Sequence, residues 1–140
     1  MKAWASTKVV SRGITHEADR LPRIIAVINS KKVGLVTYNI IQSNLEIVTL
    51  NALKQQEGIG KGLVTEVEKI ARREKCSRIW VITTNDNSGA VSFYEAQGFK
   101  VIAVYKDAIE QSRKLKPEIP MIGINGIPIT DEIELEKILL

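Results

Sequence analysis

The distribution of hydrophobic positions divides the chain into a weak N-terminal pattern and a strongly patterned remainder. Near the start, Val9, Val10 and Ile14 fit one short helix or irregular structure, and THEAD (Thr15–Asp19) has the composition of a helix start. Three runs rich in β-branched residues follow, separated by short turns. They predict an antiparallel meander of strands at Arg23–Asn29, Val33–Ile41 and Leu45–Leu53.

The next stretch changes to helical spacing. Its apolar residues recur on one face, at Leu63, Val64, Val67, Ile70 and Ala71. The run RIWVITT (Arg78–Thr84) is apolar without alternation, which is typical of a strand covered on both faces. Strand, helix and buried strand together predict a βαβ unit with a right-handed crossover.

The C-terminal part predicts two more helices and two more strands. In chain order these are a helix capped by Asn87 or Ser88 and closed by Gly98, a strand at Phe99–Lys106, a short charged helix at Asp107–Lys116, a loop at Pro117–Ile129 and a strand at Thr130–Leu139. Because Ile133 and Leu135 alternate with glutamates, we expect the last strand to be half exposed. The layout is a single α+β domain, residues 1–140, built on a mixed sheet.

Composition and charge narrow the functional classes. The chain is 44% hydrophobic and 26% charged, as in a globular domain, and its net charge of +4 fits a solvated surface or an anionic partner. Nucleic acid is not expected, because aromatic residues are only 5% of the chain and offer no stacking platform. No apolar run is long enough for a targeting signal or membrane span, so we expect no membrane partner. With one histidine, His16, and one cysteine, Cys76, we expect no metal, a structural thiol and a cytoplasmic setting.

The stretch QQEGIGKGL places Gly58, Gly60 and Gly62 at the mouth of the amphipathic helix. A helix N-terminus presents unpaired amides and the positive end of the macrodipole, which stabilise phosphate. Glycines let a phosphate approach the backbone, and Lys61 adds a cation. The P-loop and Rossmann patterns both fail, because each lacks a glycine that it requires. The stretch therefore predicts an anion cradle, with a tight turn as the alternative.

Two motifs resemble those of the GNAT superfamily of N-acetyltransferases. Gln55-x-x-Gly58-x-Gly60 resembles its Q/R-x-x-G-x-G/A signature. NSGAVSFYEAQGF resembles its N-x-x-A-x-x-F-Y-E-x-x-G-F segment, with matches at Asn87, Ala90, Phe93, Tyr94, Glu95, Gly98 and Phe99. The resemblance covers Ile24–Lys106. It implies a three-layer fold with a mixed, mostly antiparallel sheet, helices on both faces, and a parallel strand pair that splays apart to admit acetyl-CoA.

By this resemblance, Leu45–Leu53 and Arg78–Thr84 are the strands that splay. Acetyl-CoA would be the co-substrate, with its pantetheine arm on the first strand and its pyrophosphate on the glycine cradle. The residues that the resemblance assigns to it are Leu50, Asn51, Ala52, Leu53, Gln55, Gly58, Ile59, Gly60, Lys61, Gly62, Asn87 and Tyr94.

Two of the remaining assignments concern the chemistry. Tyr94 corresponds to the family's general acid, with core packing beside Phe93 as the alternative. Glu46 lies on the strand before the cradle, where some members carry a base; a water relay or an ordinary exposed residue is the alternative. The acidic residues Asp131, Glu132 and Glu134 fit either a pocket for a cationic acceptor or a solvated strand face.

The resemblance thus implies an acetyltransferase that acts on a primary amine of a small molecule or peptide by direct attack in a ternary complex. The alternative is a non-catalytic regulatory module that binds CoA or acyl-CoA. The sequence departs from the family pattern in its short connection NALKQ before the cradle and in its short N-terminal region, so the acceptor is not identified. The oligomeric state is open, with a homodimer as one alternative.

Overall fold

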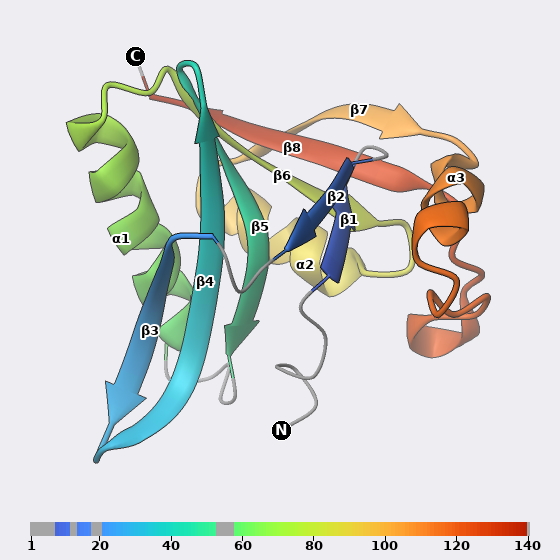
Figure 1. Ribbon diagram of the computed structural model, residues 1–140, viewed down its shortest axis with the longest axis horizontal. Helices are drawn as coiled ribbons and strands as arrows, with labels where there is room; N and C mark the ends of the chain where they lie inside the picture. Colours follow the sequence, from blue (N-terminus) through green and yellow to red (C-terminus); the bar gives the residue numbers. More distant parts are fainter. Residues whose placement is uncertain (1–7, 12–13, 18–20, 53–57, 140) are drawn as a thin grey trace.

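The computed structural model describes residues 8–11, 14–17, 21–52 and 58–139. The elements in this part of the chain (Figure 1) are β1 (Lys8–Ser11), β2 (Ile14–Glu17), β3 (Arg23–Ile28), β4 (Lys31–Ile41), β5 (Asn44–Ala52), α1 (Ile59–Arg73), β6 (Arg78–Thr84), α2 (Ser88–Ala96), β7 (Lys100–Tyr105), α3 (Ala108–Leu115), the 3-10 helix η4 (Ile124–Gly126) and β8 (Glu132–Ile138). The predicted strands, helices and their order are confirmed from residue 23 onward.

Six strands form one sheet, in the order β3-β4-β5-β6-β8-β7 (Figure 1). Its neighbouring strands are antiparallel except β5 and β6, which run parallel on either side of the α1 crossover. The predicted mixed, mostly antiparallel sheet with one parallel pair is therefore confirmed.

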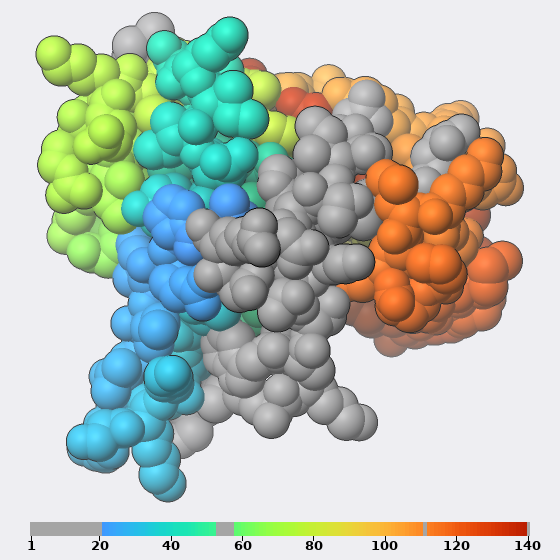
Figure 2. Space-filling view, in the orientation of Figure 1, coloured from blue at the N-terminus to red at the C-terminus, as the bar shows by residue number. Residues whose placement is uncertain are grey.

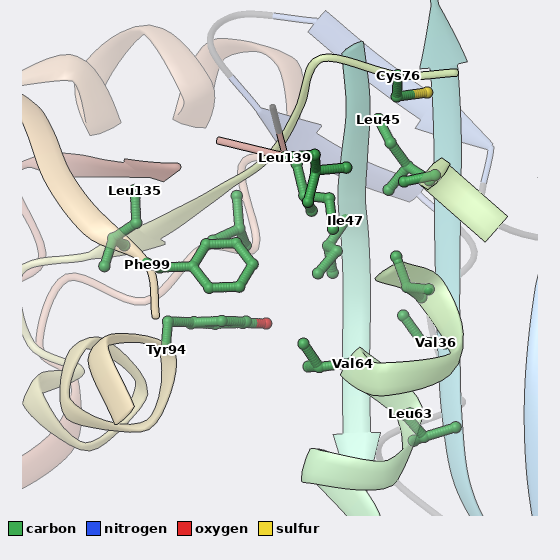
Figure 3. Packing of buried hydrophobic residues seen from close by; sticks show 14 of the residues in the cluster. Val36, Leu45, Ile47, Leu63, Val64, Cys76, Tyr94, Phe99, Leu135 and Leu139 are labelled. Atoms are coloured by element: carbon green, nitrogen blue, oxygen red, sulfur yellow. The ribbon is translucent and has the colours of Figure 1, made fainter. Parts of the chain in front are cut away.

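The sheet separates two layers of different construction. The helices α1 and α2 cover one face, and the β1–β2 hairpin and α3 lie on the other (Figure 1). The main core lies under α1 and α2, where Figure 3 shows Ile47 of β5, Val64 of α1 and Tyr94 of α2. Cys76 is buried in this core, which is consistent with the structural thiol that was expected. The far end of the β3–β4 hairpin projects from the body of the molecule (Figure 2).

The N-terminal region is a β-hairpin, so the predicted helix start at Thr15 is wrong. β1 and β2 pair antiparallel, with Val10 opposite Thr15 and Val9 opposite His16. Threonine and valine suit a strand as soon as a partner strand is present, and the capping signal read from Thr15 was purely local. Contacts of β1 with β5 and α3 hold the hairpin on the sheet.

The prediction of a half-exposed last strand is also wrong. The glutamates of β8 share the face opposite Leu135, and this face is covered as well, because Glu132 and Glu134 are buried. Arg78 donates hydrogen bonds to Glu134 at 3.2 Å and to Glu136 at 2.9 Å, and the Tyr105 hydroxyl donates to Glu134 at 2.6 Å. Such partners offset the cost of burying a carboxylate. A solvated strand face is therefore excluded for Glu132 and Glu134.

Contacts at the start of α1 and within its second half fix the helix on the sheet. A Cβ atom on Gly34 of β4 would lie 2.7 Å from Ile59 Cγ2, so glycine at this position allows the start of α1 to approach the sheet. Further along α1, Glu68 accepts a hydrogen bond from Lys137 of β8 at 2.7 Å, and Lys137 also donates to the Gln97 carbonyl at 3.0 Å. The bond from Lys137 is the main cause that lowers the pKa of Glu68. These contacts connect α1, β8 and the end of α2.

Candidate active site

The parallel strands β5 and β6 separate halfway along their length. They pair only over Asn44–Ile47 of β5 and Arg78–Val81 of β6. Directly beyond, the β4–β5 register shifts and leaves Val48 as an extra residue on β5. A bulge of this kind bends its strand. β5 therefore turns away from β6 while it stays paired with β4, which is the splayed geometry that the family resemblance implied.

The divergence leaves one edge of β5 open. Among the described strands, none pairs with this edge beyond the bulge. Backbone groups of Leu50, Asn51 and Ala52 on this edge can therefore bond a ligand that carries amides, such as an extended peptide-like arm. Leu53 and Gln55, which were predicted to join them, lie outside the described residues.

A cavity of about 320 Å³ occupies the divergence. Residues of β5, of the start of α1 and of α2 line it: Leu50, Ala52, Gly58, Gly60, Lys61, Asn87, Gly89, Ala90, Phe93 and Tyr94. Seven of these ten belong to the predicted cofactor-binding set. The fold has thus brought α2 together with the end of β5 and the start of α1, which lie much earlier in the sequence.

The glycine stretch forms the mouth of α1. Gly58 precedes the helix in the left-handed conformation (φ 71°), which glycine adopts at little cost. α1 begins at Ile59, so its first amides, those of Ile59, Gly60 and Lys61, have no intrahelical partner. The amide of Gly62 instead donates to the Gly58 carbonyl at 2.9 Å. The prediction that the Gly62 amide is open to a phosphate is therefore wrong, and the helix begins among the glycines instead of after them.

The space between α1 and α2 depends on Gly60. A Cβ atom there would lie 3.2 Å from Phe93 Cζ, so any larger side chain would project into the cavity wall. Phe93, predicted as core, packs against the core and also lines the cavity. Gly89 and Ala90 were not predicted as site residues. The three-residue spacing of Asn87, Ala90 and Phe93, which places them on one helix face, was the signal that could have identified Ala90.

Both ends of α2 have the predicted features. Asn87 is the N-cap, and its Oδ1 accepts a hydrogen bond from the Ala90 amide at 3.0 Å. Gly98 follows the helix with a positive φ of 93°. Because Asn87 and Tyr94 are separated by two helical turns, both face the cavity from the same side of α2.

Tyr94 is the buried member of the cavity wall. Its side chain packs edge-to-face against Phe93, with ring centroids 5.2 Å apart, and against Phe99 at 5.3 Å. Figure 3 shows its hydroxyl directed away from α2, on the side of the core where Val64 lies. Burial raises the pKa of Tyr94 above that of an ordinary phenol, so the hydroxyl keeps its proton. The residue is therefore a core side chain that also lines the cavity and keeps its hydroxyl protonated.

This raised pKa predicts a loss of stability in alkali. The contribution of Tyr94 to the free energy of unfolding is fully present below the unfolded-state pKa of about 10. It falls as the pH rises above that value, because the unfolded chain releases the phenolic proton more readily. Through this one group, the free energy of unfolding decreases by at most about 1.4 kcal/mol per pH unit. We expect the unfolding free energy of Tyr94→Phe to fall less than that of the unmodified protein between pH 9 and 11. Equal decreases, measured by urea titration, would show that burial does not perturb this residue.

Glu46 lies next to the point where the strands part. It is only 5% exposed, and its β5 neighbours Leu45 and Ile47 face the core under α1. Because side chains alternate along a strand, Glu46 faces the opposite side, which the β1–β2 hairpin covers (Figure 1). It stands beside Trp80 of β6 in the parallel register and does not line the cavity. The prediction of an exposed strand residue is therefore wrong, while its role as a base stays a prediction.

The other acidic residues predicted for an acceptor pocket are engaged within the fold. Glu134 is held by Arg78 and Tyr105, and Asp131 accepts a hydrogen bond from the Asp107 amide at 3.0 Å. Neither they nor Glu132 line the cavity. Within the described ranges, His, Cys, Asp and Glu side chains form no group of three or more that could hold a metal ion. None of the helices described is long and apolar enough to cross a membrane.

Comparisons with known proteins agree with this geometry. The model of the Acetyltransferase (GNAT) family matches residues 4–99. The uncharacterized protein YdhI of Bacillus subtilis strain 168 is 40% identical over 140 residues, which cover 99% of this chain and 87% of YdhI. A Bacillus subtilis acetyltransferase in complex with CoA is similar with a TM-score of 0.74 and 25% identity, over 87% of this chain and 79% of its own. A GNAT family acetyltransferase from Elizabethkingia anophelis with acetyl-CoA bound has a TM-score of 0.72 and 25% identity, over 84% and 75% of the two chains.

Proposed function

Because the chain belongs to the GNAT family and is an acetyl-CoA-dependent acetyltransferase, we propose that it acetylates a primary amine by direct attack in a ternary complex. The observation that carries this proposal is the cavity in the β5–β6 divergence. It unites an open strand edge, a helix N-terminus with glycines and a buried tyrosine.

The residues around the cavity fit the co-substrate. The open edge at Leu50–Ala52 offers partners for the amides of a pantetheine arm, and the first amides of α1 suit a pyrophosphate. Lys61 lines the same cavity and adds positive charge. Gly60 leaves room that a Cβ would occupy, so the absence of a side chain serves the ligand as well as the packing against Phe93.

Tyr94 is proposed to act as the general acid. Acetyl-CoA, when bound, supplies a thioester, and attack of the amine nitrogen on its carbonyl carbon forms the amide and breaks the carbon–sulfur bond. Tyr94 donates its hydroxyl proton to the departing sulfur. A thiol has an ordinary pKa of about 8.5 and a phenol about 10, so this transfer is slightly uphill in water. Burial raises the pKa of Tyr94 as well, so the transfer depends on the cost of a bare thiolate in the same buried cavity, which favours protonation of the sulfur.

Glu46 is proposed to remove the proton from the attacking amine, from the face opposite α1 and α2. If so, Glu46→Gln lowers kcat/KM by about 100-fold near pH 7. The loss shrinks as the pH approaches about 10.4, where a lysine-like amine is deprotonated in solution. The measurement is a pH–rate profile of thiol release. An exposed glutamate, Glu74, provides the control Glu74→Gln, which we expect to match the unmodified enzyme. A water relay in place of Glu46 would leave the two profiles superimposed.

The proposed function is tested in two independent steps. CoA at a hundredfold excess over its dissociation constant should stabilise the protein by about 2.7 kcal/mol. A panel of small-molecule and peptide amines, incubated with acetyl-CoA, should then include acceptors that release free CoA thiol. Stabilisation by CoA without release for any amine would favour the alternative of a CoA-binding regulatory module. Absence of stabilisation at millimolar CoA would contradict both.

A further inference from the structure

The turn between β6 and α2 carries one wall of the cavity. Thr84 ends β6 and Asn87 caps α2, so only Asn85 and Asp86 lie between them. Asn87 lines the cavity, and so do residues of α2 as far as Tyr94. The conformation of this two-residue turn therefore sets where the wall lies relative to β5 and α1.

The Asn87 side chain has a fixed orientation and an unused donor. Its Oδ1 accepts a hydrogen bond from the Ala90 amide at 3.0 Å, and this bond orients the side-chain amide group. Among the described residues, none accepts a hydrogen bond from Asn87 Nδ2. A primary amide nitrogen carries two N–H donors, so Nδ2 can donate to an oxygen of a ligand in the cavity. The amide carbonyls of a pantetheine arm are acceptors of this kind.

Asn85 bonds the turn to the segment that precedes β8. Its Oδ1 accepts hydrogen bonds from the amides of Thr130 and Asp131, each at 3.0 Å, and its Nδ2 donates to the Pro128 carbonyl at 2.9 Å. The Asn85 backbone amide donates to the Asp131 carbonyl at 3.2 Å. Asn85 therefore holds the turn on a segment more than forty residues later in the chain.

Asp86 makes the second connection. It is 5% exposed, and its carboxylate accepts hydrogen bonds from the Thr84 hydroxyl and, at 3.0 Å, from the Ile124 amide. The backbone of the later segment comes so close that a Cβ atom on Gly123 would lie 2.6 Å from Asp86 Cγ. Because the next residue in the chain is Asn87, a shift of Asp86 is passed directly to the cap of α2.

The segment that receives these bonds is itself fixed to α3. Arg113 of α3 donates hydrogen bonds to the carbonyls of Pro120 at 2.7 Å and Ile129 at 2.8 Å. The amide of Ile109, also in α3, donates to the Thr130 carbonyl at 3.0 Å. The β6–α2 turn is therefore bonded to a braced support, which is the arrangement that keeps a ligand-binding side chain in one orientation.

We infer that Asn85 and Asp86 are positioning residues for the binding of CoA. They hold the β6–α2 turn on the segment of residues 124–131, and they thereby fix Asn87 where its Nδ2 donates to the pantetheine arm. Neither side chain lines the cavity, so both act through Asn87. The inference rests on the proposed placement of CoA in the cavity, but its test needs no acceptor amine.

The test is a double-mutant cycle on the full chain, in which calorimetric titration gives the dissociation constant of CoA. Asn87→Ser keeps an oxygen that caps α2 and removes Nδ2, so it should weaken CoA binding by about tenfold, as expected for one lost hydrogen bond. Asp86→Ala releases the turn and should weaken CoA binding by about fivefold. In the double variant, Asp86→Ala should add less than about twofold, because the contact through which it acts is already absent.

Three further variants examine the same link. Gly123→Ala leaves Asp86 in place but puts a Cβ against its carboxylate, so it should weaken CoA binding about as much as Asp86→Ala does. It replaces Asp86→Ala in the cycle if that variant does not fold. Asp86→Asn keeps one acceptor oxygen for the Ile124 amide and should bind CoA within about twofold of the unmodified protein. Glu118→Ala removes an exposed acidic residue near this segment and is the control, with CoA affinity unchanged.

Two results would overturn the inference alone. One is an unaltered CoA affinity in both Asp86→Ala and Gly123→Ala. The other is a double variant in which the separate losses of Asp86→Ala and Asn87→Ser multiply, because independent effects assign Asp86 to general folding. In both cases the unmodified protein still binds CoA, so the proposed function stands. If CoA does not bind the unmodified protein, the proposed function and this inference are overturned together.

Discussion

Replacing Gly60 with tryptophan abolishes the stabilisation that CoA gives to the protein. A Cβ atom at this position already lies 3.2 Å from Phe93 Cζ, so an indole ring has to enter the cavity between α1 and α2 or push the two helices apart. Either change blocks access to the first amides of α1. The expected loss is the whole shift, about 2.7 kcal/mol at a hundredfold excess of CoA over its dissociation constant. The measurement is the thermal unfolding midpoint of each protein with and without CoA.

Gly62→Trp is the matched control for that variant. A Cβ atom on Gly62 meets no atom within 4 Å, and its amide is already bonded to the Gly58 carbonyl. The same indole, two residues further along α1, should therefore leave the response to CoA in place. Both variants carry the same change in helix propensity, so their difference isolates the cavity. A Gly60→Trp protein that CoA still stabilises fully would mean that the phosphate-bearing ligand binds elsewhere.

Tyr94→Phe lowers kcat by about 100-fold while the affinity for CoA is retained. The substitution removes only the hydroxyl, because phenylalanine fills the same space between Phe93 and Phe99. General acid catalysis contributes about 100-fold to 10,000-fold, and the lower end applies to a leaving group that is already a fair one, such as a thiolate. Steady-state kinetics with saturating acetyl-CoA and amine gives kcat, and the CoA-dependent shift in unfolding midpoint gives the affinity.

A second tyrosine provides the control for this change. Tyr38 is a half-buried residue of β4 that packs at the margin of the same core but does not line the cavity. Tyr38→Phe removes an equivalent hydroxyl and should leave kcat within about twofold. If Tyr94→Phe and Tyr38→Phe are equally active at saturation, then Tyr94 is a packing residue and the sulfur takes its proton from another source.

The secondary structure from residue 23 onward was predictable because its signals are local. The bounds of β6 agree with the prediction, and so do the cap at Asn87 and the positive φ of Gly98. Each depends on residues within a few positions in the chain. Even here the start of α1 was misplaced. Glycine is a poor helix former, yet Gly60 and Gly62 lie in the first turn, where contacts of Ile59 with the sheet outweigh propensity.

The errors lie where strands find distant partners. Thr15 has the local chemistry of a helix cap, but the pairing of β2 with β1 decides its conformation. Glu132 and Glu134 alternate with apolar residues as in an exposed strand. They are buried, and Glu134 is bonded by Arg78 of β6 and Tyr105 of β7, the two strands between which β8 is inserted.

The order of residues alone was enough to specify the elements from residue 23 onward, the two motifs and the cap at Asn87, because each depends on short-range spacing. The three-dimensional fold alone decided that these segments meet around one cavity, that the Gly62 amide is bonded to the Gly58 carbonyl, and that Asn85 and Asp86 are bonded to the segment before β8. The physical reason is the range of the interactions. Strand insertion, bulges and the partners of buried carboxylates depend on groups that are far apart in the chain. A local sequence pattern therefore does not predict where those groups come together.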